Sequence, residues 1–229
     1  PINDAPSFEL INSNNETIDH IEIFEDYESQ TFIIQDGKTP KDEDEQTVEY
    51  FLNPETVEFA DININRTDGT LTINSIQDLF GSYEFIITAD DNGDDSTVVF
   101  EDAAGTVVVG EDKFTHSFIL DIISVNDPPS FEKGDDQSIL EDDGLISIPW
   151  ATNIRSGPPD EEEKPQELIF QVDSSYKDLF SEFPLINPNT GYLTYQIADD
   201  LNGEIAILVT LKDDGGTDYG GVDESNPDT

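Results

Sequence analysis

The sequence contains no cysteine, which excludes disulfide bonds, thiolate metal sites and cysteine nucleophiles. It also contains no methionine and begins at Pro1, so we expect it to be a fragment of a longer polypeptide. No apolar run approaches the roughly 18 residues that a membrane-spanning helix needs, and we expect no direct membrane insertion. Phosphate loops, dinucleotide fingerprints and nucleophile elbows are missing from the sequence, so we do not expect an enzyme.

Basic residues are scarce. Only 9 Lys and Arg stand against 53 Asp and Glu, which gives a formal net charge of -44. Of these, 29 acidic and 4 basic residues lie before residue 125, so the acidity belongs to both halves of the chain. Such a charge repels phosphate backbones and anionic lipid, so we expect no nucleic-acid partner. Cations are the partners that the composition favours.

Two segments recur about 122 positions apart. The residues of 83–93 are similar to those of 205–215, and the residues of 1–8 are similar to those of 124–131. Each repeat therefore opens with an Asn-Asp-x-Pro segment and later ends an apolar stretch in an acidic turn. We expect two domains, 1–124 and 125–229, each large enough for its own core.

The apolar residues alternate with a period of two, which is typical of β-strands. With 14 Phe, 7 Tyr and 1 Trp to fill the cores, we expect a folded all-β chain of two tandem antiparallel β-sandwiches with few or no helices. In the first repeat the expected strands are 7–10, 31–35, 47–52, 57–64, 70–74, 82–89 and 115–124; in the second they are 146–149, 167–172, 192–197 and 204–211. The second repeat lacks a counterpart of 115–124 and is therefore expected to be incomplete at its C-terminus. We expect either truncation there or completion of the open edge by another chain.

Strands that run up and down bring alternate turns to the same end of a sandwich. This tracing predicts that carboxylates from three segments meet where the two repeats join. Calcium suits such a site because it accepts 6 to 8 oxygen ligands in irregular geometry. The predicted ligands at the junction are Glu25, Asp78, Asn126, Asp127, Glu162, Glu163 and Asp213. A second cluster is predicted at the N-terminal end of the first repeat, from Asn3, Asp4, Asp42, Glu43 and Asp91.

Two other residue types offer weaker signals. The histidines, His20 and His116, have no neighbouring residues in a metal-binding pattern, and we expect ordinary strand residues. Trp150 is expected to lie in a core or an interface, with a sugar-stacking platform as the less favoured interpretation.

The motifs resemble those of the cadherin family and of the cadherin-like repeats in large bacterial surface proteins. The pattern Tyr83-x-Phe85-x-Ile87-x-Ala89-x-Asp91-x-Gly93 resembles the cadherin strand that ends in A-x-D-x-G. Residues 125–131, Val-Asn-Asp-Pro-Pro-Ser-Phe, resemble the linker D-x-N-D-N-x-P-x-F. Glu25 and Glu141 resemble the early acidic ligand of that family, while Asp78 and Asp200 fall at the aspartate of its L-D-R-E motif.

This resemblance implies a cadherin-like or immunoglobulin-like Greek-key sandwich. It also implies that bound Ca²⁺ stiffens the junction between repeats, so that the chain acts as an extender in an extracellular, cell-surface adhesin. Its partners would be the neighbouring repeats of the same polypeptide and a surface glycan or protein ligand. The alternative function is a calcium-dependent carbohydrate-binding module. The sequence does not identify the ligand.

Overall fold

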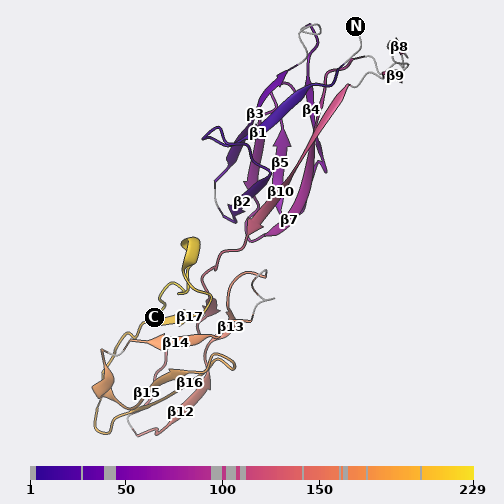
Figure 1. Cartoon of the computed structure of the whole chain (residues 1–229). Coiled ribbons are helices and arrows are strands. Elements are labelled where there is room, and N and C mark those ends of the chain that lie inside the picture. Colours follow the sequence, from indigo (N-terminus) through magenta and orange to yellow (C-terminus); the bar gives the residue numbers. More distant parts are fainter. Residues whose placement is uncertain are drawn as a thin grey trace. The chain divides into compact units, whose positions relative to one another are not determined.

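The computed structural model describes residues 4–26, 28–38, 45–93, 100–101, 107–108, 112–140, 142–159, 161, 165–173, 175–201 and 203–229. The chain divides into two compact units, Pro1–Ser124 and Val125–Thr229, called unit 1 and unit 2 below (Figure 1). Each unit is built of β-strands, and the all-β class predicted from the alternating pattern is confirmed.

Unit 1 consists of two four-stranded sheets. The first has the order β1-β3-β6-β5 and the second has the order β2-β10-β7-β4. Their bounds are β1 Ser7–Ile11, β2 His20–Phe24, β3 Gln30–Lys38, β4 Glu49–Asn53, β5 Ala60–Ile64, β6 Leu71–Ser75, β7 Gly81–Asp90 and β10 Lys113–Ile123. Two short strands, β8 Phe100–Glu101 and β9 Val107–Val108, pair only with each other.

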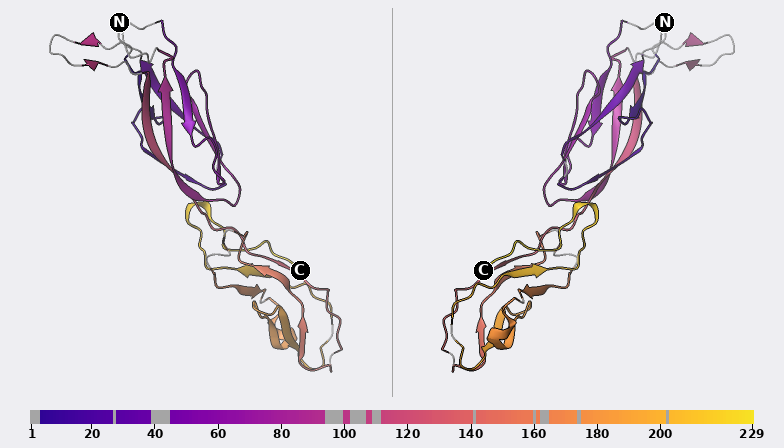
Figure 2. Two further views of the ribbon diagram at one scale, coloured as in Figure 1. Left: turned by 90° about the vertical axis from the view of Figure 1, so that its right-hand side faces the viewer. Right: turned by 90° about the vertical axis from the view of Figure 1, so that its left-hand side faces the viewer.

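The core of unit 1 lies between its two sheets, which stack face to face (Figure 2). Alternate residues of each strand point inward, as the two-residue period requires. Phe85 of β7 and Phe118 of β10 stack with ring centroids 5.5 Å apart, and both are almost completely buried. Leu71 and Ile73 of β6 face them from the first sheet with no exposed surface.

Strand β2 is absent from the predicted strands. The chain leaves the first sheet after β1 and enters the second sheet at His20, where β2 pairs with β10 in parallel. The remaining ladders of unit 1 are antiparallel. Because both neighbours run in the same direction, Phe24 lies opposite Ile123, at the same end of unit 1.

Unit 2 contains smaller sheets, with the orders β11-β13, β12-β16-β15 and β14-β17. The strands are β11 Ser130–Glu132, β12 Ile146–Pro149, β13 Thr152–Arg155, β14 Ile169–Val172, β15 Phe180–Ile186, β16 Tyr192–Ile197 and β17 Val209–Lys212. The predictions for β12 and β16 are confirmed residue for residue. The core gathers around Trp150, Phe170, Tyr195 and Leu211, so Trp150 is a core residue.

The last predicted strand of unit 2, 204–211, is wrong in its first half. Residues 203–208 form no strand, and Ile205 and Leu208 are exposed despite their alternation. Only β17 forms a strand in which alternate residues are buried, because Val209 and Leu211 are buried and pair with β14.

The C-terminal edge of unit 2 needs a second correction. Residues 213–229 contain no named strand, but residues 223–228 run antiparallel beside β17 through two isolated bridges, Val209 with Asp228 and Lys212 with Glu224. Ser225 N also donates to Leu211 O at 2.9 Å. This segment occupies the side of β17 that was predicted to be open.

Helical structure within the described ranges is limited to 3-10 turns: η2 Lys177–Leu179, η3 Asp218–Gly220 and the single position Glu161. Accordingly, the helices of the described residues include none of the length and apolarity that a bilayer span requires.

Candidate functional site

One end of unit 1 carries three acidic residues. Glu25 directly follows β2, is 1% exposed, and its N donates to Ile123 O at 2.9 Å. Asp26 and Asp78 occupy turns with φ of 63° and 57°, a backbone region that Asp tolerates better than most residues. A carboxylate oxygen of Asp26 lies within 4.8 Å of one of Asp78. Two turns of unit 1 therefore bring their carboxylates together beside the last residues of β10.

In unit 2, Asn126 lies at the centre of a hydrogen-bonded group. Its Nδ2 donates to Asp213 Oδ1 at 3.1 Å and to Val222 O at 2.8 Å, while Val222 N donates to Asn126 O at 2.8 Å. Its Oδ1 accepts a bond of 2.9 Å from Gln166 Nε2. The opening segment of unit 2 is thus bonded to the turn that follows β17.

Two further residues extend this group. Glu161, which is 4% exposed, accepts from Asp127 N at 2.8 Å through Oε1 and from Gln166 Nε2 at 2.8 Å through Oε2. We call Asn126, Asp127, Glu161, Gln166 and Asp213 the Asn126 cluster. It joins three segments that are far apart in the sequence.

Glycine at position 215 is required by this packing. A Cβ there would lie 1.7 Å from Asn126 Oδ1 and 2.8 Å from Gln166 Nε2, far inside van der Waals contact. Gly215 N also donates to Asp213 Oδ1 at 2.9 Å. The Asp-Asp-Gly turn therefore both presents the carboxylate and leaves room for the amides.

The electrostatics of Asp213 are unfavourable for a carboxylate. Burial raises its pKa, and repulsion from Asp223 and Asp214 adds to the rise, although the bonds from Gly215 and Asn126 oppose it. Its Oδ2 atom is buried and accepts no hydrogen bond from the described residues, and the same holds for Gln166 Oε1. A buried charged oxygen without a partner is costly, and a bound cation removes that cost.

The chemistry of the cluster fits calcium. Its side chains offer carboxylate and amide oxygens, which calcium accepts, and no sulfur or imidazole. Asp213 Oδ2 and Gln166 Oε1 are buried oxygens of the cluster that accept no hydrogen bond from the part of the chain that the structure describes.

Five of the seven predicted junction ligands lie within the described residues. Glu25 and Asp78 lie at one end of unit 1, and Asn126, Asp127 and Asp213 lie close together in unit 2. The ligands Glu162 and Glu163 fall outside the described residues, as does Glu141. The sequence analysis missed two members of the Asn126 cluster as ligand candidates, Glu161 and Gln166. Glu161 lies in the same acidic run, but nothing in the spacing of that run distinguishes its members.

The second predicted cluster is described only in part, because Asn3, Asp42 and Glu43 fall outside the described residues. Asp4 is exposed and precedes β1, while Asp91 is 2% exposed and accepts from Gly93 N at 2.9 Å.

A lysine that the sequence analysis did not consider lies at the same end of unit 1 as Asp91. Lys113 Nζ is 3.2 Å from Asp112 and 3.5 Å from Asp90, and these carboxylates raise the lysine pKa. Part of the negative charge there is therefore already balanced by a side chain.

No family model matches the sequence, and no curated protein matches it. Among solved structures, the chain is similar to human protocadherin-24 EC1-2, with 13% identity, a TM-score of 0.43, and coverage of 99% of this chain and 95% of that one. Mouse cadherin-23 EC22-24 has 12% identity and a TM-score of 0.48, with coverage of 96% and 65%. The titin domains z1z2 in complex with telethonin have 14% identity and a TM-score of 0.33, with coverage of 93% and 90%. At these identities and scores, the assignment of a β-sandwich depends on the strand order of the units themselves.

Proposed function

We propose that the chain is a calcium-binding extender and adhesion module, made of two tandem cadherin-like repeats, from a large extracellular protein of a bacterial cell surface. Calcium binds where the two repeats join and restricts their relative motion. The chain's partners are the neighbouring repeats of its own polypeptide and an adhesive ligand.

The observation that carries this proposal is the buried Oδ2 of Asp213, which receives no hydrogen bond from the described residues. It belongs to a cluster that offers only oxygen ligands in a chain of net charge -44. Such an oxygen is stable only if it is protonated or if a cation is bound beside it. At neutral pH the cation is the simpler solution, and calcium is the hard divalent ion that tolerates irregular oxygen geometry.

Covalent connection supports placing the metal at the junction. Ile123 accepts a hydrogen bond from Glu25 and precedes Asn126 by three residues. Three residues of extended chain span about 10 Å at most. The proposed ligands from the first repeat are Glu25 and Asp78; those from the connection and the second repeat are Asn126, Asp127, Glu162, Glu163 and Asp213.

Rigidity follows from electrostatics. Without metal, carboxylates at the ends of two adjoining repeats repel each other and the connection flexes. With metal, shared coordination bridges them, and binding to the ordered state alone stabilises that state. A second set, Asn3, Asp4, Asp42, Glu43 and Asp91, would serve the preceding junction in the same way.

Small-angle X-ray scattering of the whole chain tests the proposal. Calcium is expected to narrow the distribution of interatomic distances relative to a sample in chelator, while the far-ultraviolet circular dichroism of the strands stays unchanged. Calcium titration calorimetry on the same sample counts the bound ions. Identical scattering profiles, together with no heat of binding, would overturn the proposed function.

The position of Trp150 does not favour the carbohydrate-binding alternative. Trp150, for which sugar stacking was the less favoured interpretation, is 9% exposed and packs against Phe131 with ring centroids 6.3 Å apart.

A further inference from the structure

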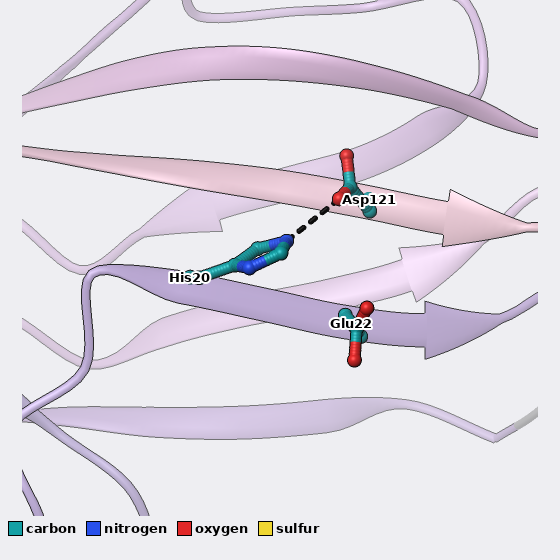
Figure 3. A group of neighbouring side chains, drawn as sticks. All are labelled: His20, Glu22 and Asp121. Carbon is teal, nitrogen blue, oxygen red and sulfur yellow. Dashed lines mark hydrogen bonds and ion pairs between the residues drawn. The ribbon is translucent and has the colours of Figure 1, made fainter.

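A group of three potential metal ligands lies on the solvent-facing side of the second sheet of unit 1, away from the acidic turns. His20 and Glu22 belong to β2, and Asp121 belongs to the adjacent strand β10 (Figure 3). One ligand atom from each of the three lies within 4.8 Å of the others. The sequence could not indicate this group, because His20 and Asp121 are 101 residues apart.

The parallel register explains why the three side chains share one face. Asp121 lies opposite Glu22, and Ile119 lies opposite His20. The intervening residues Ile21 and Leu120 point into the core and are almost completely buried. Because the core fixes both strands, the backbone holds His20, Glu22 and Asp121 in place on the opposite face.

The distances suit a small divalent ion. His20 Nε2 lies 2.6 Å from Asp121 Oδ2. Two ligands of a tetrahedral zinc ion, each bonded at about 2.0–2.2 Å, are separated by about 3.3 Å. An ion therefore enters if the pair opens by about 0.7 Å, which side-chain rotation provides without moving the strands.

The ligand types select the class of ion. One imidazole nitrogen and two carboxylate oxygens form a donor set that zinc binds, with a water at the fourth position. Calcium is disfavoured here because it prefers oxygen ligands alone and needs 6 to 8 of them.

A further side chain positions one of the ligands. The side chain of Ser82, opposite Asp121 on β7, hydrogen-bonds to Asp121, and this bond and that from His20 keep the pKa of Asp121 below its usual value. The hydrogen bond from Ser82 orients the carboxylate, as second partners of metal ligands commonly do.

We propose that His20, Glu22 and Asp121 form a binding site for Zn²⁺ or a similar divalent transition metal, which clips the edge strand β2 to β10. This site shares no residue with the Asn126 cluster and does not depend on the calcium proposal.

Imidazole resonances in a nuclear magnetic resonance titration with Zn²⁺ provide the test. The chain has only two histidines, and His116 lies on the same strand as Asp121, with its Nε2 3.3 Å from Ile18 O. The titration uses the whole chain in a large excess of Ca²⁺, which occupies the oxygen sites. We expect the His20 resonances to shift and saturate near one equivalent of zinc, while those of His116 stay in place.

Matched variants separate a site from a surface ion pair. Asp121→Asn and Glu22→Gln are each expected to weaken zinc binding at His20 at least about tenfold, because each removes one of the two carboxylate ligands. Glu84→Gln is the control. Glu84 is an exposed residue of β7 that lies opposite Ile119 of β10, and its substitution removes the same charge as Glu22→Gln does. It should leave binding unchanged.

Three results would overturn the site: no shift of His20 at excess zinc, equal shifts of both histidines, or an unchanged affinity in Glu22→Gln. A His20 shift that weakens as the calcium excess is raised further would also overturn it, since that indicates general attraction of cations to an acidic surface. Circular dichroism of each variant establishes that the strands remain folded.

Discussion

Replacing Asp213 with Asn tests the central physical claim, that a buried carboxylate oxygen in unit 2 needs a cation. The substitution keeps the volume of the side chain and the Oδ1 acceptor used by Asn126 and Gly215. It removes the charge from a position that is 8% exposed and where burial raises the pKa. The variant therefore changes charge and little else.

The expected effect has opposite signs with and without calcium. An unpartnered buried acceptor costs about 1–3 kcal/mol, and more when it is charged. In chelator, Asp213→Asn should therefore stabilise unit 2 by about 1–2 kcal/mol, since an unpartnered neutral amide is cheaper than an unpartnered carboxylate. In calcium at 100 times its dissociation constant, wild type gains about 2.7 kcal/mol from binding, and the variant loses most of that gain.

Trp150 provides a direct measurement. It is the only Trp of the chain and lies in the core of unit 2, so thermal unfolding followed by its fluorescence reports unit 2. About 1 kcal/mol corresponds to roughly 4–8 °C in Tm for a small domain. Asp214→Asn is the control, because it removes the same charge from an exposed neighbour whose Oδ1 accepts from Glu167 N.

Two outcomes would refute the reasoning. If Asp213→Asn lowers the Tm of unit 2 in chelator, the buried oxygen is not under electrostatic strain. If calcium raises the Tm of the variant and of wild type equally, Asp213 is not a ligand.

Three further predictions concern geometry, pH and the core. Gly215→Ala should reduce calcium affinity at least about tenfold, because the added Cβ displaces the side chain of Asn126. Gly216→Ala is the control: a Cβ there would have no atom within 4 Å, and at a φ of +93° it adds only backbone strain, so the calcium affinity should be kept. Equal losses of affinity in the two variants, measured by calorimetry, would contradict this prediction. Because the pKa of Asp213 is raised, the folded unit binds its proton more tightly than the unfolded chain does. In chelator, the stabilisation from protonated Asp213 is present below the pKa of the unfolded chain and is lost as pH rises through the pKa of the folded unit. Calcium affinity should fall as pH drops through the folded pKa of Asp213, because the proton competes with the ion. A calcium affinity that does not change between about pH 7 and 4 would be inconsistent with this prediction. Phe118→Ala should destabilise unit 1 by about 3–5 kcal/mol, since Phe118 is 1% exposed and stacked on Phe85. Thermal unfolding followed by tyrosine fluorescence should show this lower stability. The unfolding transition of unit 2, followed by Trp150 fluorescence in chelator, should not move.

Strands whose alternate residues meet a core were predictable from the sequence. The pattern in 82–89 and in 192–197 found β7 and β16, because alternate residues there are buried: Phe85, Ile87 and Ala89 in β7, and Leu193 and Tyr195 in β16. The same alternation in 204–211 predicted a strand that starts too early, since β17 begins at Val209. Ile205 is not paired in the β14–β17 ladder and is 36% exposed. Periodicity indicates which residues are able to share a face, whereas pairing depends on partners elsewhere in the chain.

Strand β2 shows the opposite failure. Ile21 and Ile23 alternate with polar residues, but the strand has only five residues and follows a turn rich in Asn. What stabilises it is its parallel partner β10, about a hundred residues later. Local sequence patterns therefore could not predict any group of side chains that depends on this pairing, including His20 with Asp121.

The acidic turns were predictable as locations but not as individual ligands. The tracing of up-and-down strands brought Asp127 and Asp213 to one end of the second repeat, and their hydrogen bonds to Glu161 and Asn126 place them in one group. It did not distinguish Glu161 from the neighbouring acids of its run, because that choice depends on the close approach of Gly157, where a Cβ would lie 2.6 Å from Glu161 Oε2.

For calcium bound at the Asn126 cluster as proposed, the neutral amides of the cluster would determine how binding is coupled to folding. Asn126 and Gln166 donate to carboxylates and to a backbone carbonyl, so the cluster is hydrogen-bonded before any metal arrives. A site assembled in this way differs from a small metal-dependent domain, in which the ligands come together only when the ion binds. Asp213 carries a cost in the metal-free state, since burial raises its pKa, while the apolar core of unit 2, around Trp150 and Leu211, is made of other residues. Chelation should therefore lower the Tm of unit 2 and loosen its first residues without unfolding it at room temperature. A loss of the buried Trp150 emission on chelation at 25 °C would show instead that the metal is part of the core's stability.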